Sequence, residues 1–264
     1  MASAPGYDVI LQAFSGIMSM TGEEGGPNIR SPISPIDQMT GIHALTGILA
    51  ALYARKNHGK GCHVEVSLFE TAVAILGYNL QSFWERGTQP RKCGSSHESL
   101  CPYQAFEAAD GPVMIGVAND SLWRKFCSVA RLDDIVDDPR FRTNADRVSH
   151  RAETLAVVER AVGEQTVAFW DSELAKVRVP CSPINTLKQL VEHPHTAASG
   201  IVMQYEHPVA GVLKSVAQPV QFDGAERAVD LPAPAHGADS DGILAELGIL
   251  EREIARLRTN NIIR

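Results

Sequence analysis

The sequence predicts a mixed fold, with an α/β core and a smaller α+β part near residues 85–184, on three observations. Residues 37–57 carry apolar side chains at helical spacings of three and four. Residues 103–117 and 201–224 alternate apolar and polar side chains around glycine-containing turns, which is typical of hairpins. Amphipathic helical patterns fill much of residues 120–177. Helices and strands interleaved in this way are typical of an α/β or α+β architecture.

Each element of the first hundred residues follows from its local pattern. Residues 8–14 are mostly apolar, so they are expected to be buried, and the glycine-rich "SMTGEEGGPN" that follows is expected to turn. The helix over residues 37–57 is expected to stop at "NHGKG". Residues 63–67 alternate like a short strand, and residues 69–86 have helical periodicity.

The next elements begin with the clearest loop of the chain, "TQPRKCGSSHESLCP", at residues 88–102. Strands are expected at residues 103–107 and 113–117, with Ala109-Asp110-Gly111 as their turn. Two amphipathic helical regions follow, and the Asp-Pro dipeptide in "DDPRFRTNADRVSH" separates them.

After Pro183 the chain restarts with a helix that Asn185 or Thr186 can cap. A hairpin and a C-terminal helical segment broken at Gly248 complete the chain. The expected organisation has three parts. These are residues 1–84 (the remainder of a large domain), 85–184 (a small α+β domain) and 185–264 (a linker and a return to the large domain).

Composition excludes several classes of function. The chain has 264 residues, and its net charge of -7 disfavours binding to nucleic acid. Its five cysteines form no CxxC pair, so no metal site is expected and free thiols in a reducing cytoplasm are the simplest reading. The N-terminus does not resemble a signal peptide, and the longest apolar stretch, residues 44–54, is too short to cross a membrane.

No GxGxxG, GxxxxGK[ST], HExxH or GxSxG motif occurs. His193 and His195 flank a proline and are expected in a surface turn. The three tryptophans fall on helical faces, so core packing is expected for Trp84, Trp123 and Trp170.

Two features are candidates for chemistry. Asp37 falls where the helix N-cap is expected, and a helix N-terminus favours an ionised carboxylate. Such a carboxylate in an apolar pocket can attack an activated acyl group, although simple capping is the commoner role. The small residues around Gly94, Ser95, Ser96 and His97 allow a mobile loop that could enter a site, but they also suit a surface connector.

The chain resembles the class III CoA transferases, which include formyl-CoA transferase, carnitine CoA transferase and the bile-acid-inducible transferases. The segments that carry the resemblance lie between Gly6 and Ile263. They are "GYDVILQAFSGIMSMTGEEGGP", "IDQMTGIHALTGILAALYARKNHGKGCHVEVSLFE", "CPYQAFEAADGPVMIGVAN", "DDPRFRTNADRVSHR", "VPCSPINTLKQL" and "ELGILEREIARLR". The resemblance implies that Asp37 is the nucleophile of CoA transfer between carboxylic acids, through an aspartyl anhydride and an aspartyl-CoA thioester. It also implies that the loop Gly94–His97 covers the acyl-aspartyl intermediate.

The resemblance further implies a Rossmann-like large domain, incomplete here at its N-terminus, and an interlocked homodimer. The partners would be an acyl-CoA and a small carboxylic acid, with CoA as substrate and no permanent cofactor. Much of the CoA site lies in the family's N-terminal segment, so weak CoA binding is expected of this chain and its CoA-contacting residues stay open. The related α-methylacyl-CoA racemases have a histidine where this chain has Tyr7, and tyrosine is a poor base near neutral pH. A racemase-like enzyme and a catalytically silent family member are the alternatives.

Overall fold

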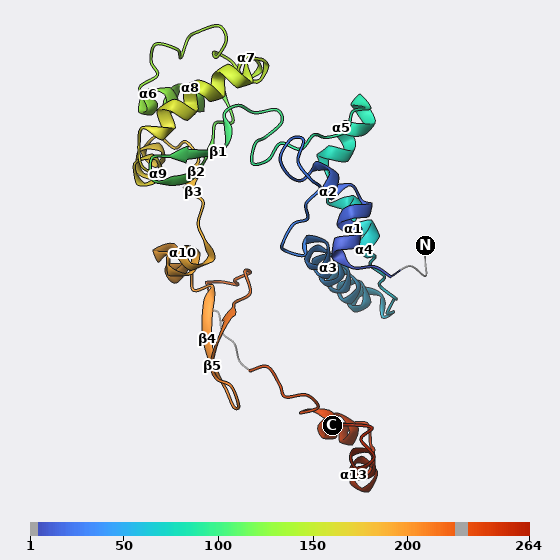
Figure 1. Ribbon diagram of the computed structural model, residues 1–264. Coiled ribbons are helices and arrows are strands. Elements are labelled where there is room, and N and C mark those ends of the chain that lie inside the picture. The colour runs from blue at the N-terminus through green and yellow to red at the C-terminus, as the bar shows by residue number, and fades with distance from the viewer. Residues whose placement is uncertain (1–4, 225–231) are drawn as a thin grey trace. The chain divides into compact units, whose positions relative to one another are not determined.

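A computed structural model of the protein describes residues 5–224 and 232–264, which divide into two compact units, Met1–Ile184 and Asn185–Arg264. Figure 1 shows helices and two small antiparallel sheets, so the expected mixture of helices and strands is confirmed. The first unit contains α1 (Asp8–Phe14), α2 (Ile17–Met20), α3 (Pro35–His58), α4 (Leu68–Ala74), α5 (Tyr78–Arg86), β1 (Tyr103–Ala108), β2 (Gly111–Gly116), α6 (Asp120–Ala130), α7 (Asn144–Ser149), α8 (Arg151–Gly163), α9 (Val167–Lys176) and β3 (Cys181–Pro183). The Rossmann-like part, the dimer and the three-part domain division stay predictions.

Helix α1 buries its polar side chains and exposes its apolar ones. Asp8 and Gln12 are buried, whereas Val9, Ile10 and Phe14 are exposed. The expectation that residues 8–14 form a buried segment is therefore wrong for the apolar side chains. The two polar side chains are buried because they bond to each other and to the chain near the start of α3.

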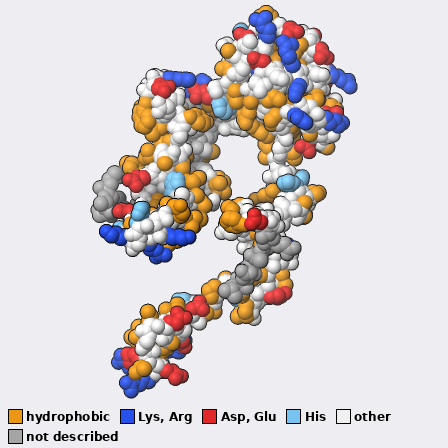
Figure 2. All heavy atoms as spheres, turned by 180° about the vertical axis from the view of Figure 1, so that it is seen from behind, with side chains coloured by type: hydrophobic (Ala, Val, Ile, Leu, Met, Phe, Trp, Pro, Cys, Tyr) orange, Lys and Arg blue, Asp and Glu red, His pale blue; other side chains and the backbone are white. Residues whose placement is uncertain are grey.

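Helix α3 confirms the long helix expected over residues 37–57, but it begins two residues earlier, with Pro35 in the first turn. Its C-terminal cap is Gly59, which has the left-handed φ of 69° that favours glycine. Ile36 at the start of α3 is buried, but the other large apolar side chains along the helix are exposed, and they are Met39, Ile42, Leu45, Ile48, Leu49, Leu52 and Tyr53. Hydrophobic side chains accordingly cover much of the surface of the N-terminal helical part in Figure 2.

Two expectations between residues 63 and 86 are wrong. Residues 63–67 form no strand, and residues 5–102 contain no other strand with which they could pair. They instead lie against α3, where a Cβ on Gly47 would approach Val64 to 3.0 Å. The helix expected over residues 69–86 is divided into α4 and α5 because Gly77 adopts φ 52° and ψ -126°, which are not helical.

Strands β1, β2 and β3 form an antiparallel sheet in that order, and helices α8 and α9 pack on it. The expected hairpin is confirmed, with Tyr103 opposite Gly116 and Ala108 opposite Gly111. A hydrophobic core lies between the sheet and its helices, and it contains the fully buried Trp123. Trp170 also lies in this core, as expected, but Trp84 is 67% exposed, so the expectation of core packing is wrong there.

The second unit contains α10 (Leu187–Glu192), α11 (Pro194–Ser199), β4 (Val202–His207), β5 (Gly211–Val216), α12 (Ser240–Glu246) and α13 (Glu251–Thr259). Thr186 caps α10 through a reciprocal capping box with Gln189, and β4 pairs with β5 as expected. The helical break at Gly248 is also confirmed. No helix within residues 5–224 and 232–264 has both the length and the apolar character to cross a membrane.

Candidate active site

A carboxylate from another segment caps the helix that carries Asp37. One oxygen of Asp8, Oδ2, accepts hydrogen bonds from the backbone N–H groups of Ile36 (2.8 Å) and Asp37 (3.2 Å). Its other oxygen accepts from the side-chain amide of Gln12, whose own carbonyl oxygen accepts from the backbone N–H of Ser31 at 2.9 Å. Asp8 therefore satisfies the free N–H groups at the start of α3.

Asp37 itself is not the N-cap residue, so that expectation is wrong. Ser34 occupies the N-cap position and Asp37 is the third residue of α3. The Asp37 side chain is exposed and has no hydrogen-bond or ion-pair partner within the part of the chain that is described. The carboxylate of Asp37 is therefore accessible to solvent.

The loop that contains Gly94 is attached to the glycine-rich turn after α2. The backbone N–H of Gly94 donates to the Gly22 carbonyl at 2.8 Å, and the Lys92 ammonium donates to the Gly26 carbonyl at 2.8 Å. Gly94 has a left-handed φ of 57°, and a Cβ there would collide with the Glu23 carboxylate. Glycine suits this position because of its backbone conformation, and a larger residue would require the Glu23 side chain to move.

The remaining loop residues are also fixed by short-range bonds. The Ser95 hydroxyl oxygen accepts from the backbone N–H of Ala105 at 3.1 Å, and the Ser96 hydroxyl donates to the Cys93 carbonyl at 2.6 Å. His97 Nδ1 accepts from the backbone N–H of Ser99 at 3.1 Å. In the neutral ring the proton therefore lies on Nε2, which leaves Nε2 as a donor. The loop is thus an ordered structure rather than a loose connector.

A buried arginine links this loop to the small sheet and its helices. Arg147 is fully buried and donates to the carbonyl of Cys101 at 2.7 Å and to that of Phe141 at 2.8 Å. It forms an ion pair with Asp120 at 3.0 Å and lies over the ring of Trp123. Burial of Cys101 raises the pKa of its thiol. The sequence patterns gave no signal for this role of Arg147, because its partners are distant in sequence.

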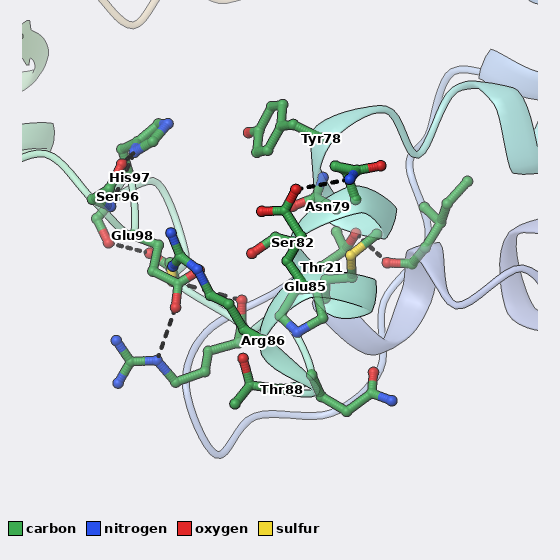
Figure 3. A pocket seen from close by; sticks show the side chains of 18 of the residues that line it. Thr21, Tyr78, Asn79, Ser82, Glu85, Arg86, Thr88, Ser96, His97 and Glu98 are labelled. Carbon is green, nitrogen blue, oxygen red and sulfur yellow. Dashed lines mark hydrogen bonds and ion pairs between the residues drawn. The ribbon is translucent and has the colours of Figure 1, made fainter.

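The loop forms one wall of a pocket of about 820 Å³. Figure 3 shows Ser96 and His97 on one side, and Asn79 and Ser82 of α5 on the other. Gly94 also lines this pocket, whereas Ser95 lines a neighbouring pocket of about 290 Å³.

Asp37 lines neither of these pockets, so the structure does not bring the predicted nucleophile and the predicted loop together in one cavity. The larger pocket contains two arginines that suit an anionic ligand, Arg86 and Arg91, and Arg91 pairs with Glu98 at 3.6 Å. No group of three or more metal-binding side chains occurs within residues 5–224 and 232–264.

Comparison with known proteins gives relatives along most of the chain. It is 32% identical over 260 residues to an acyl-CoA transferase of Fusarium pseudograminearum, covering 98% of this chain and 57% of that protein. It is 36% identical over 216 residues to an acetyl-CoA:oxalate CoA-transferase of Acetobacter aceti, covering 79% of this chain and 56% of that protein. The chain thus spans little more than half the length of these relatives.

A solved structure gives the same picture. A CAIB/BAIF family protein from Brucella suis superposes with a TM-score of 0.78 at 29% identity, covering 93% of this chain and 64% of that one. The sequence profile of CoA-transferase family III matches residues 1–240, which is most of the chain. The chain therefore belongs to CoA-transferase family III.

Proposed function

We propose that this protein transfers CoA between carboxylic acids, with Asp37 as the covalent nucleophile. The Asp37 carboxylate attacks the thioester carbonyl of an acyl-CoA, which gives a mixed anhydride and CoA thiolate. The thiolate attacks the aspartyl carbonyl of the anhydride, which forms an aspartyl-CoA thioester and releases the donor acid. An acceptor carboxylate then attacks that thioester, and the same two steps in reverse release a new acyl-CoA and restore Asp37.

The observation that carries this proposal is that Asp8 caps α3, whereas the side chain of Asp37 does not. A capping carboxylate is held by backbone N–H groups and is a poor nucleophile, because its lone pairs are already engaged. Here Asp8 performs the capping, at 2.8 Å and 3.2 Å from the two nitrogens, and the side chain of Asp37 stays exposed. Helix capping, the commoner role of an aspartate at the start of a helix, therefore does not account for Asp37.

The ordered loop supports the second part of the proposal, which is protection of the intermediates from water. Mixed anhydrides and aspartyl thioesters are readily hydrolysed, so an enzyme that transfers CoA must exclude water while they exist. Gly94, Ser96 and His97 form a wall of the larger pocket, and the Nε2–H of His97 is available as a donor to an acyl oxygen. In this proposal the loop covers Asp37 when an acyl group is bound.

Dicarboxylic acids are the first acids to test. Relatives of the chain are named for succinyl-CoA and glutarate, for acetyl-CoA and oxalate, and for succinyl-CoA and mesaconate. The larger pocket also offers two guanidinium groups, from Arg86 and Arg91, that could bind the second carboxylate of such an acid.

The experiment compares the chain with its Asp37→Ala variant, with succinyl-CoA as donor and glutarate or oxalate as acceptor. Mass spectrometry follows the new acyl-CoA and any CoA adduct on the peptide that contains Asp37. Loss of a nucleophile commonly lowers turnover by about 10⁴-fold or more, so both signals should disappear. Asp171→Ala changes an exposed carboxylate on α9 and should leave both unchanged.

Turnover of Asp37→Ala within about tenfold of the parent would contradict the assignment of the nucleophile. Exchange of the α-proton of an acyl-CoA with solvent, without CoA transfer, would instead indicate racemase-like chemistry. Absence of both reactions in the unmodified chain would indicate a catalytically silent family member.

A further inference from the structure

We propose that Arg151 and Asn144 are positioning residues that clamp the backbone of the loop His97–Cys101 and thereby limit loss of the acyl group to water. Neither residue touches the proposed nucleophile. The clamp is inferred from the contacts of these two side chains alone. Its role in protecting the intermediate rests on the proposed function.

Arg151 begins helix α8 and reaches back to the loop. Its Nη2 donates to the carbonyl of Glu98 at 2.8 Å and to the carbonyl of His97 at 3.1 Å. One terminal nitrogen thus orients two successive peptide groups, one of them belonging to the residue whose ring lies in the pocket wall. Lysine could not reproduce this planar geometry, because its ammonium donors are not held in a fixed fork.

Asn144, the first residue of α7, holds the next part of the same loop. Its side-chain amide donates to the Ser99 carbonyl at 2.8 Å, and its side-chain oxygen accepts from the backbone N–H of Cys101 at 3.2 Å. Both polar atoms of one side chain are therefore used on the loop backbone. Together with Arg151, it engages the backbone of four of the five residues from His97 to Cys101, all except Leu100.

The clamp is attached to the hydrophobic core of the first unit. Helix α8 packs on strand β1, and its Val158 and Val162 are fully buried in the hydrophobic core. Buried Arg147 adds a bond to the carbonyl of Cys101, at the end of the same loop. A loop tied at this many points to a packed helix pair has few alternative conformations, because moving it breaks several hydrogen bonds at once.

The consequence for catalysis is a competition between water and CoA thiolate for the mixed anhydride. If water reaches the mixed anhydride, its oxygen adds to the acyl carbonyl, the Asp37 carboxylate leaves, and the net reaction is acyl-CoA plus water to free acid plus CoA thiol. If water is excluded, CoA thiolate attacks the aspartyl carbonyl instead, the donor acid leaves, and CoA then passes from Asp37 to an acceptor acid. Loosening the clamp should therefore raise hydrolysis relative to transfer.

The first experiment tests the clamp by hydrogen–deuterium exchange of peptides covering residues 94–101 in the full chain. In Arg151→Gln we expect the amides of residues 97–101 to exchange about tenfold faster, because local opening becomes easier. Asn144→Asp is a second variant that keeps an acceptor for Cys101 N–H but loses the donor to the Ser99 carbonyl, so it should accelerate exchange near residues 99–101. Arg160→Gln, an exposed arginine on the same helix, should leave the loop unchanged.

The second experiment measures free acid and new acyl-CoA from succinyl-CoA, with and without glutarate. We expect the ratio of hydrolysis to transfer to rise several-fold in Arg151→Gln and Asn144→Asp, with KM changed less than this ratio, and to stay constant in Arg160→Gln. A merely structural role would lower both reactions together and leave their ratio unchanged.

Identical loop exchange in the variants and the parent would overturn the clamp. Faster exchange with an unchanged ratio would overturn its role in protecting the intermediate. A parent chain that transfers no CoA would contradict the proposed function and the shielding role, whereas the exchange result would still decide the clamp by itself.

Discussion

Residues 103–184 and residues 5–100 bury their hydrophobic side chains to very different extents. Every member of the hydrophobic core cluster lies between Phe106 and Val179. Within residues 5–100, the buried hydrophobic side chains are those of Ile36, Ala72 and Leu76. The later region has a closed core of its own, with a sheet covered by helices, whereas the earlier region consists of helices whose apolar faces remain exposed.

The difference shows that similar hydrophobic patterns can have different structural outcomes. Helix α3 has large apolar side chains at helical spacings, as the helices around the sheet have, yet its Leu45 and Leu49 are more than half exposed. Exposed apolar surface on this scale favours association with another surface. The homodimer predicted from the family resemblance would provide such a surface, and it stays a prediction.

The largest expected effect comes from the same substitution made in both regions. Leu174→Ala removes a fully buried side chain from the core on α9, so it should lower the free energy of unfolding by about 2–5 kcal/mol. Leu49→Ala removes a side chain that is 57% exposed on α3, so it should change the free energy of unfolding by less than about 0.5 kcal/mol. Urea unfolding followed by circular dichroism measures both.

An equal loss of unfolding free energy in the two variants would contradict the difference between the two regions, because it would mean that the apolar face of α3 is covered in solution. Light scattering coupled to size exclusion, run on the parent and on Leu49→Ala, then identifies the cause. A parent that is dimeric and a variant that dissociates would show that a second copy covers Leu49.

A smaller effect is expected where the earlier region depends on a polar contact instead of apolar packing. Asp8→Ala removes the cap of α3 and leaves the N–H groups of Ile36 and Asp37 without their acceptor. Loss of a cap of this kind should lower the free energy of unfolding by about 1–2 kcal/mol. Urea unfolding measures the loss, with Asp171→Ala as a control at an exposed position on α9. No change in Asp8→Ala would mean that Asp8 does not stabilise α3.

Local patterns predicted the elements whose stabilising contacts are local. The hairpin of β1 and β2 was predictable because its strands alternate and Asp110-Gly111 suits a turn, and the capping box of Thr186 and Gln189 lies within four residues. The strand expected at residues 63–67 was wrong because alternation does not provide a partner strand. In the candidate site, the roles of Asp37 and the loop stay predictions, and the capping by Asp8 was not predictable, because Asp8 acts on Ile36 across 28 positions of the chain.

The smallest expected effect concerns pH and the capping box of α7 in the later region. The Thr143 hydroxyl donates to the Asp146 carboxylate at 2.6 Å and lowers the pKa of that carboxyl below its usual value. A carboxyl whose pKa is lower in the folded state stabilises the fold above its unfolded pKa of about 3.9, and this contribution is lost as the pH falls through the folded pKa. The stability difference between the parent and Asp146→Asn should therefore be constant near neutral pH and shrink below about pH 4. Thermal unfolding of both proteins over a pH series measures it, and a difference that persists unchanged at the acid end would show that the charge of Asp146 contributes nothing to the cap.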